Sequence, residues 1–342
     1  MLWNTGKSGI VIVSIENILW AAVGYAGGKE VKIQMLIELV LLVIGFVMLI
    51  KGADIFVDGA AGIAARFGIS QLVIGLTIVA MGTSAPEAAV SIAAAFKGTA
   101  DITIGNVVGS NIMNILVILG VTAVIAALDI QQSTVRYELP FVMAVTLAML
   151  AMGGVDKRVG RMDGVILWAL FVAYLVYLFI MAMRNKEEEP AQTGRPVWLL
   201  IVFVILGAVL IVAGADVSVD AASEIARMIG LSERFIGLTI VAFGTSLPEL
   251  CTSVVAAKKG KADLAIGNIV GSNIFNILFV VGTTALIVPV PFNPAFIIDT
   301  AVAAGAALLL WLCVLPKKKL TRPGGILMLG CYAAYFVYLM IK

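Results

Sequence analysis

The chain has 342 residues, of which 61% are hydrophobic and only 13% are charged, and its mean hydropathy is +1.09. Soluble domains contain about 45–50% apolar and about 25% charged residues, so this composition excludes an ordinary soluble enzyme and a disordered chain. The net charge of +2 provides no basic surface for nucleic acid. Histidine is absent, which excludes histidine ligands and histidine-based catalysis. These features predict an integral membrane protein that is not an enzyme.

Ten segments are apolar and long enough to cross a bilayer, which requires about 20 residues. In chain order they are 35–58, 70–97, 101–128, 137–153, 162–183, 197–220, 232–258, 263–288, 295–315 and 323–341. They predict an all-α membrane protein with ten transmembrane helices. Residues 184–196 form a polar linker between a first five-helix repeat at 35–183 and a second at 197–342.

Residues 1–34 form an N-terminal extension. Its segment 10–27 is apolar but contains Glu16 and several glycines. This pattern fits an eleventh crossing, a surface helix, an uncleaved signal-like segment, or residues upstream of a true start at Met35. The sequence leaves these alternatives open.

The two halves share an internal repeat. Residues 52–116 align with 214–278 at a constant offset of 162, without gaps and with 40 identities in 65 positions. Because each half contains an odd number of crossings, the second copy enters the membrane from the opposite side. The repeats are therefore predicted to be inverted, an arrangement that places a transporter's binding site at the midplane between the halves.

Lys and Arg are slightly unequal on the two sides of the predicted bilayer. The side of the 184–196 linker carries 12 of them, against nine on the other side from Lys29 onward. Positive residues are enriched in cytoplasmic loops. The linker is therefore expected to be cytoplasmic, in a multi-pass protein of the plasma (inner) membrane.

Glu87 and Glu249 lie about halfway along apolar segments, where an ionised carboxylate costs several kcal/mol unless it is paired, solvated or coordinated. The repeat helices carry no Lys or Arg at those depths, so a cation from solution is the expected partner. The preceding Gly82–Pro86 and Gly244–Pro248 interrupt helical hydrogen bonding. We therefore expect a broken helix in each half at the midplane.

The same sequences also have a capping interpretation. Ser84 to Glu87 and Ser246 to Glu249 fit the S-x-x-E capping box, with proline in the first helical turn. Capping satisfies two amides but leaves the carboxylate charge uncompensated, and a capped glutamate can also hold an ion. The break is expected to free backbone carbonyls at Ala80 and Ala242.

The motif Gly-Ser-Asn-Ile-x-Asn occurs once in each half. Ser110 and Asn114 are four residues apart, as are Ser272 and Asn276, so each pair presents a hydroxyl and an amide oxygen on one helix face. Hard cations such as Ca2+ prefer oxygen ligands of this kind. The glycines of the motif also fit close helix packing.

Four aspartates lie near the ends of the first helix of each half: Asp54 and Asp58, and their repeat equivalents Asp216 and Asp220. They fit either an entry path that attracts cations or solvated helix ends.

The glutamate and Gly-Ser-Asn motifs resemble the two alpha repeats of the sodium/calcium exchangers and their relatives in the calcium/cation antiporter superfamily. The resemblance implies ten helices in two inverted five-helix halves around a central cluster of ion sites. Several relatives carry aspartate where this chain has Asn276, so two formal negative charges are expected here. By position, the implied ligands are Glu87, Glu249, Thr83, Ser84, Thr245, Ser246, Ser110, Ser272, Asn114 and Asn276, with the carbonyls of Ala80 and Ala242.

The expected function is secondary active exchange of Ca2+ for Na+ by alternating access, with inorganic cations and the lipid bilayer as partners and no cofactor. Proton/calcium exchange is an alternative, because a desolvated glutamate can trade its proton for a metal. A passive cation channel is another. A more distant alternative is an intramembrane aspartyl protease using Asp54 and Asp216, which would leave the glutamate motifs without a role.

Overall fold

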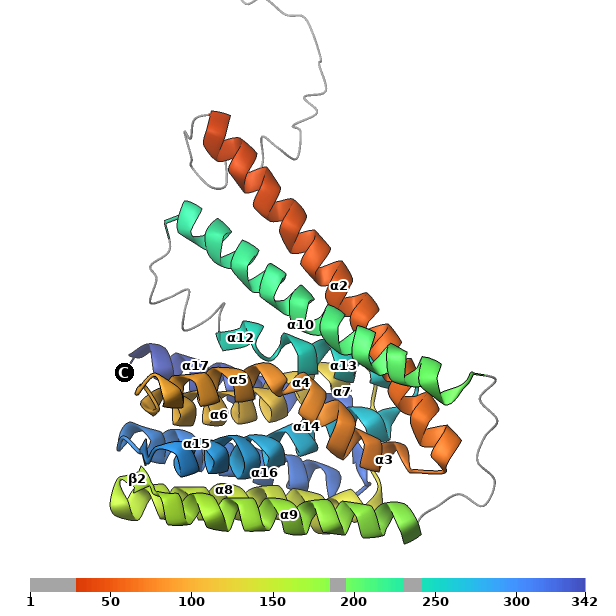
Figure 1. The fold of residues 1–342 in the computed structure, drawn as a ribbon, viewed down its shortest axis with the longest axis vertical. Helices are drawn as coiled ribbons and strands as arrows, with labels where there is room; N and C mark the ends of the chain where they lie inside the picture. Colours follow the sequence, from red (N-terminus) through yellow and green to blue (C-terminus); the bar gives the residue numbers. More distant parts are fainter. Residues whose placement is uncertain (1–28, 185–194, 231–241, 342) are drawn as a thin grey trace, which may run out of the picture.

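A computed structural model describes residues 29–184, 195–230 and 242–341. Almost all of this part of the chain is helical (Figure 1). Eight of its helices are long and apolar enough to cross a membrane, and one bent helix pair raises the number to nine. Each of the ten predicted crossings has helical counterparts at the expected place, although residues 232–241 of the seventh lie outside the described residues. The prediction of an all-α, multi-pass membrane protein is therefore confirmed.

The first half opens with one long helix, α2 (Lys29–Phe67). The predicted second crossing is divided into α3 (Gln71–Ile74), a π-helical segment η1 (Gly75–Val79), α4 (Ala80–Thr83) and α5 (Ala85–Phe96). The third is continuous through α6 (Asp101–Met113), η2 (Asn114–Leu119) and α7 (Gly120–Ile125). The fourth and fifth are η3 (Thr134–Glu138) with α8 (Leu139–Asp156), and α9 (Arg161–Arg184).

The second half repeats this order. It begins with α10 (Val197–Met228), followed by α12 (Ala242–Gly244) and α13 (Leu247–Lys258). A continuous crossing then runs through α14 (Ala262–Phe275), η5 (Asn276–Val281) and α15 (Gly282–Ile287). The last two crossings are α16 (Ala295–Val314) and α17 (Arg322–Ile341). The predicted segment 10–27 lies outside the described residues, but α2 begins at Lys29, so the helix starts before the predicted boundary at residue 35.

Two short antiparallel strand pairs join loops of the two halves, and the sequence did not predict them. β1 (Leu128–Asp129) pairs with β4 (Lys319–Leu320), and β2 (Arg158–Val159) pairs with β3 (Val290–Pro291). In an inverted ten-helix arrangement the first pair falls on the side where α9 ends and α10 begins, here called the linker side. The second pair falls on the opposite side. Each pair thus joins loops that lie on the same side in the inverted arrangement.

Helices α2 and α10 pack against each other and cross the remaining helices obliquely (Figure 1). Glycines permit a very close antiparallel approach: a Cβ on Gly207 would lie 2.6 Å from the backbone nitrogen of Phe56, and one on Gly214 would lie 2.8 Å from the Gly45 carbonyl oxygen. Small residues allow such backbone contact between membrane helices. The two longest helices therefore form one tightly packed pair.

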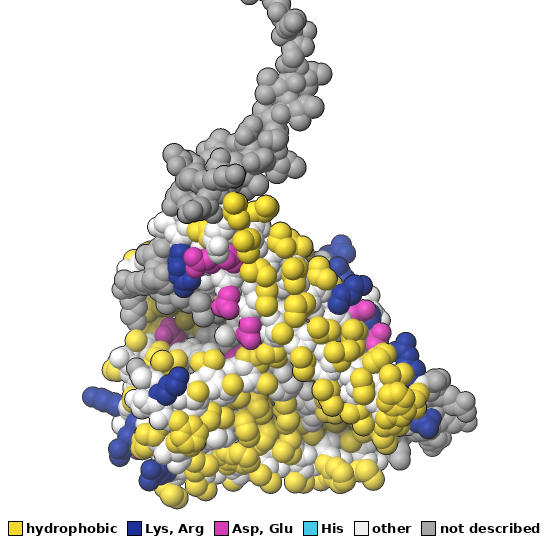
Figure 2. Space-filling model, turned by 45° about the horizontal axis from the view of Figure 1, so that its top comes forward, with side chains coloured by type: hydrophobic (Ala, Val, Ile, Leu, Met, Phe, Trp, Pro, Cys, Tyr) yellow, Lys and Arg dark blue, Asp and Glu magenta, His cyan; other side chains and the backbone are white. Residues whose placement is uncertain are grey.

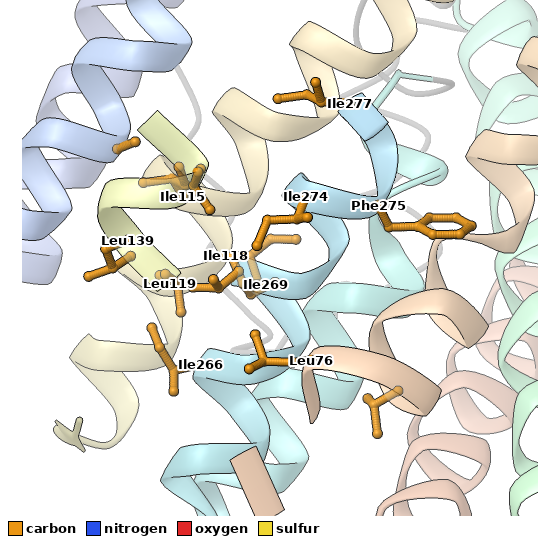
Figure 3. Close-up of a cluster of buried hydrophobic side chains, with 14 of the residues drawn as sticks. Leu76, Ile115, Ile118, Leu119, Leu139, Ile266, Ile269, Ile274, Phe275 and Ile277 are labelled. Carbon is orange, nitrogen blue, oxygen red and sulfur yellow. The ribbon is translucent and has the colours of Figure 1, made fainter. Parts of the chain in front are cut away.

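The other helices surround the crossing formed by α14, η5 and α15. In its most apolar stretch, 94% of the residues are buried inside the protein, against 11% for α17. Ile266, Ile269 and Ile274 of this central helix pack near Leu76 of η1 and Ile118 of η2 (Figure 3). The outer face shown in Figure 2 is mostly hydrophobic, with Lys and Arg gathered toward its left and right edges. This distribution suits a protein whose helix ends lie at two membrane surfaces.

Candidate cation-binding site

The first repeat helix breaks at Ser84, where α4 and α5 meet at a bend of 49°. Pro86 lies in the first turn of α5. Neither Ser84 nor its repeat equivalent Ser246 makes a side-chain cap hydrogen bond, so the capping-box interpretation is wrong. The Ser84 hydroxyl donates instead to Oε1 of Glu249 over 2.7 Å, and this contact joins the two repeat motifs.

Both motif glutamates are enclosed by protein. Glu87 is 1% exposed and Glu249 is not exposed. Both carboxylate oxygens of Glu87, and Oε2 of Glu249, have no hydrogen-bond partner in the described part of the chain. Burying an ionised carboxylate without partners costs several kcal/mol. These three oxygens therefore require a cation or protons to balance them.

Four asparagines connect the two central helices by reciprocal bonds. The Asn111 amide nitrogen donates to the Asn273 carbonyl over 3.2 Å, and Asn273 returns the same bond to Asn111. Asn114 donates to Oδ1 of Asn273 over 2.9 Å, and Asn276 donates to Oδ1 of Asn111 over 3.1 Å. Because the nitrogens of Asn114 and Asn276 are used in this way, their amide oxygens are the atoms left over, and neither has a partner among the described residues.

The break in the first repeat is also held from the second half. The Ala80 carbonyl accepts a hydrogen bond from the Ser272 hydroxyl over 3.4 Å. Thr83 donates to Oδ1 of Asn268 over 3.0 Å. Ala80, Thr83 and Ser272 are all buried. The structure therefore brings these three predicted site residues together with the glutamates and asparagines.

The remaining predicted site residues lie around this cluster. Ser246 is buried and its hydroxyl has no partner among the described residues, whereas Thr245 is half-buried. Ala242 begins α12 at the edge of the described chain. Ser110 is buried and lines a cavity of about 340 Å³ that also contacts Asp299 and Tyr335. This cavity lies near the ends of α16 and α17 that are opposite the linker side.

Two further asparagines support the site. The amide nitrogen of Asn106 donates to the Glu87 carbonyl over 3.2 Å and to the Ser91 hydroxyl over 2.9 Å. Asn268 makes the equivalent bonds to the Glu249 carbonyl and Ser253 over 3.5 and 3.0 Å. These asparagines position the glutamate backbones. Both recur at the 162-residue offset, and the sequence alone leaves interhelical hydrogen bonding and ion contact open for them; the structure shows hydrogen bonding.

The aspartates of α2 take part in an ion cluster, not in the central site. The ammonium of Lys259 lies 2.6 Å from Oδ1 of Asp54 and 2.7 Å from Oδ1 of Asp58, and that of Lys261 lies 3.4 Å from Oδ1 of Asp58. Partial burial lowers the pKa of Lys259, but its contacts with the two aspartates outweigh this and raise it above its usual value. Lys259 is therefore charged at neutral pH. We call these four residues the linker-side ion cluster.

The structure does not pair Asp54 with Asp216 as a protease would require. Gly214 packs beside Gly45 in the antiparallel crossing, so Asp216 lies roughly level with Gly45. At 1.5 Å per residue, Asp54 is about 14 Å further along α2. Asp54 is also held by Lys259. The aspartyl protease alternative is therefore inconsistent with the fold.

The chain is similar to known proteins over most of its length. The family model described as sodium/calcium exchanger protein matches residues 37–180 and 199–341. The inner membrane protein YrbG of Escherichia coli is 36% identical over 327 residues, covering 89% of this chain and 97% of that protein. The sodium/calcium exchanger MaX1 of Methanosarcina acetivorans is 30% identical over 351 residues, covering 89% and 98%.

Solved structures give the same result for the fold. The sodium-calcium exchanger NCX_Mj, soaked with zero Na+ and Ca2+, superposes with a TM-score of 0.78 at 32% identity, covering 89% of this chain and 99% of that one. The form soaked with 10 mM Na+ and zero Ca2+ gives 0.77. With the family model matching most of the chain, the resemblance expected from the repeat motifs is confirmed: the chain belongs to the sodium/calcium exchanger family.

Proposed function

We propose that this protein exchanges Ca2+ for Na+ across a membrane by alternating access to one site between its two halves. The observation that carries the proposal is the set of buried oxygens without partners on Glu87, Glu249, Asn114 and Asn276. Oxygen donors of this kind fit hard cations. The proposed ligands are Glu87, Glu249, Thr83, Ser84, Thr245, Ser246, Ser110, Ser272, Asn114 and Asn276, with the carbonyls of Ala80 and Ala242.

The oxygen donors of the site favour a cation that tolerates an irregular coordination geometry. In the described part of the chain, no group of three or more His, Cys, Asp or Glu side chains is placed to hold a metal, so the charge of the site comes from two glutamates. Flexible carboxylate, amide, hydroxyl and carbonyl oxygens favour Ca2+ over Mg2+, which demands a tight octahedron and retains its waters. Relatives named as sodium/calcium exchangers, MaX1 and NCX_Mj, support Na+ as the counter-ion.

Charge balance bears on the energetics of exchange. Two glutamates neutralise one Ca2+ or two Na+, whereas three Na+ would leave one positive charge in excess. Exchange of three Na+ for one Ca2+ would therefore couple transport to voltage at about 2.3 kcal/mol per 100 mV. We also propose that the linker is cytoplasmic and that residues 35–183 and 197–342 are the two repeats.

Calcium uptake into liposomes driven by an outward Na+ gradient tests the proposal. Uptake should be concentrative, and it should be lost in Glu87→Gln and in Glu249→Gln, because each removes one of the two charges that balance the cation. Glu38→Gln is a matched control, since Glu38 is also a buried membrane glutamate but is bonded to Gln34 on the same helix.

Three outcomes would contradict parts of the proposal. Uptake that survives either glutamine substitution at the site would show that the ligands are wrong. Uptake that follows a pH gradient and ignores Na+ would identify a proton/calcium exchanger. Movement of Ca2+ only down its own gradient would identify a channel.

A further inference from the structure

Glu138 is another buried carboxylate, and it lies away from the cation site, in a cavity of about 470 Å³ between α8 and α9. Its lining includes Arg136, Glu138, Phe141, Tyr174 and Tyr177 and is otherwise mostly apolar. Glu138 ends the π-helical segment η3, in the second turn from the linker-side end of this crossing. The cavity is therefore near the level at which lipid head groups meet acyl chains.

Glu138 is only partly satisfied by the protein. It is 1% exposed, and one of its oxygens accepts a hydrogen bond from the Tyr177 hydroxyl. Its second oxygen, and the hydroxyl of the buried Tyr174 beside it, have no partner among the described residues. The rings of Phe141 and Tyr174 stack with centroids 5.6 Å apart. A free carboxylate oxygen beside aromatic rings is a suitable environment for an ammonium group.

The second half contains a related pair in a different cavity. In this part of the chain the halves align at an offset of 161, since Ala-Tyr-Leu-Val-Tyr-Leu at 173–178 returns as Ala-Tyr-Phe-Val-Tyr-Leu at 334–339. Glu138 and Tyr174 thus correspond to Asp299 and Tyr335, and Tyr335 donates to Oδ1 of Asp299 over 3.0 Å. Asp299 and Tyr335 line the cavity that reaches Ser110, whereas the cavity of Glu138 is lined by none of the proposed cation ligands.

The surroundings indicate where a ligand would come from. On α9, Val172, Val176 and Phe179 are 51%, 52% and 67% exposed, which identifies a surface that faces lipid. Arg136 is exposed and lines the same cavity, with its guanidinium 5.6 Å from the centroid of the Tyr137 ring. The cavity therefore offers an anion-binding group near its exposed part and a buried carboxylate within, flanked by apolar walls.

We propose that this cavity binds the head group of an aminophospholipid, with its ammonium at Glu138 and its phosphate at Arg136. A primary ammonium donates hydrogen bonds to a carboxylate, whereas a trimethylated choline cannot. Phosphatidylglycerol supplies the phosphate without the cation. The acyl chains lie along the apolar surface of α8 and α9.

Native mass spectrometry of the delipidated full chain tests this proposal. The protein is incubated with equal amounts of phosphatidylethanolamine, phosphatidylcholine and phosphatidylglycerol. We expect the ethanolamine lipid to be retained about tenfold more than the other two, since only it offers both a phosphate for Arg136 and an ammonium that donates charge-assisted hydrogen bonds to Glu138. Glu138→Gln should remove this preference, and Glu38→Gln should leave it unchanged.

A second variant keeps the test independent of the stability of Glu138→Gln. Ala173 is exposed and lines the cavity, so Ala173→Trp should fill it and abolish retention without disturbing the helix core. Equal retention of the three lipids by the unmodified protein would overturn the proposal and leave Glu138 as a partner of Tyr177 alone. Unchanged preference in both variants would also overturn it. Neither result depends on whether the protein transports Ca2+.

Discussion

Neutralising Lys259 is expected to loosen α2 from the second half on the linker side. Lys259 follows α13, and it is paired with Asp54 and Asp58 of α2 at 2.6 and 2.7 Å. The contact therefore ties the first helix of one half to the repeat motif of the other. In an exchanger that opens to each side in turn, such a tie stabilises the conformation in which the linker side is closed.

The duplicated sequence contains the same residues on the opposite side. Asp54, Asp58 and Lys259 correspond to Asp216, Asp220 and Lys97 at the 162-residue offset. Lys97 and the two α10 aspartates are exposed, and among the described residues no ion pair includes them. The linker-side cluster is thus formed while its counterpart is not. This agrees with the cavity that reaches Ser110 from the opposite side.

The size of the effect follows from the exposure of the partners. The side chain of Lys259 is 25% exposed, and those of Asp54 and Asp58 are 47% and 39% exposed. Ion pairs this accessible contribute about 0.2–1 kcal/mol each. Loss of two pairs should therefore cost the linker-closed conformation about 0.4–2 kcal/mol, which corresponds to a change of about two- to thirtyfold in the equilibrium.

The assay is the reaction of a single cysteine with a membrane-impermeant maleimide. Ala61 is buried on α2, one turn beyond Asp58, so Ala61→Cys, in a background without the native cysteines, should react slowly from the linker side. Lys259→Gln should accelerate the reaction about tenfold, and high salt should reduce the difference. Lys97→Gln is the matched control and should leave the rate unchanged. Equal acceleration by both variants, or none by Lys259→Gln, would refute the reasoning.

Three further substitutions have defined outcomes. Thr99→Lys places a lysine on the opposite side at the position equivalent to Lys261. It should stabilise the conformation that is closed on the opposite side, and it should therefore also accelerate labelling from the linker side; an unchanged rate would show that the extra lysine does not shift the equilibrium between the two conformations. Gly207→Ala forces a Cβ to within 2.6 Å of the α2 backbone and should destabilise the protein by about 1–3 kcal/mol in thermal unfolding, whereas an unchanged midpoint would mean that the helices separate at little cost. Asn276→Asp removes the bond that Asn276 donates to Asn111 and adds a third charge, so stability without cations should fall and Ca2+ should restore more of it than Na+; equal restoration by the two ions would contradict the charge argument.

The helices were predictable because each crossing is a long apolar run between polar boundaries, but two ends were predicted wrongly. The predicted segments 35–58 and 197–220 end at aspartates, whereas helix α2 continues to Phe67 and helix α10 continues to Met228. On α2, Asp58 points to a lysine of the other half and leaves the helix uninterrupted.

The principal site residues were predictable because the repeat marked them twice. Their contacts were not: Ser84 reaches Glu249, and Asn111 reaches Asn273, over 165 and 162 residues, and no periodicity records such pairs. The capping alternative fails for this reason, since the Ser84 hydroxyl bonds across the halves and not to its own helix. The two-residue strand pairs are too short to leave an alternating pattern.

The reciprocal asparagine bonds have a consequence for how the protein is made. Domains synthesised first generally fold first, yet the amide groups of Asn111 and Asn114 find their partners on α14, which is made about 160 residues later. The first half should therefore enter the membrane with these amides unsatisfied or held by water. It should remain protease-sensitive at α6 until the second half arrives. Folding of the protein in the membrane is then complete only when the second half provides the hydrogen-bond partners of these buried asparagines.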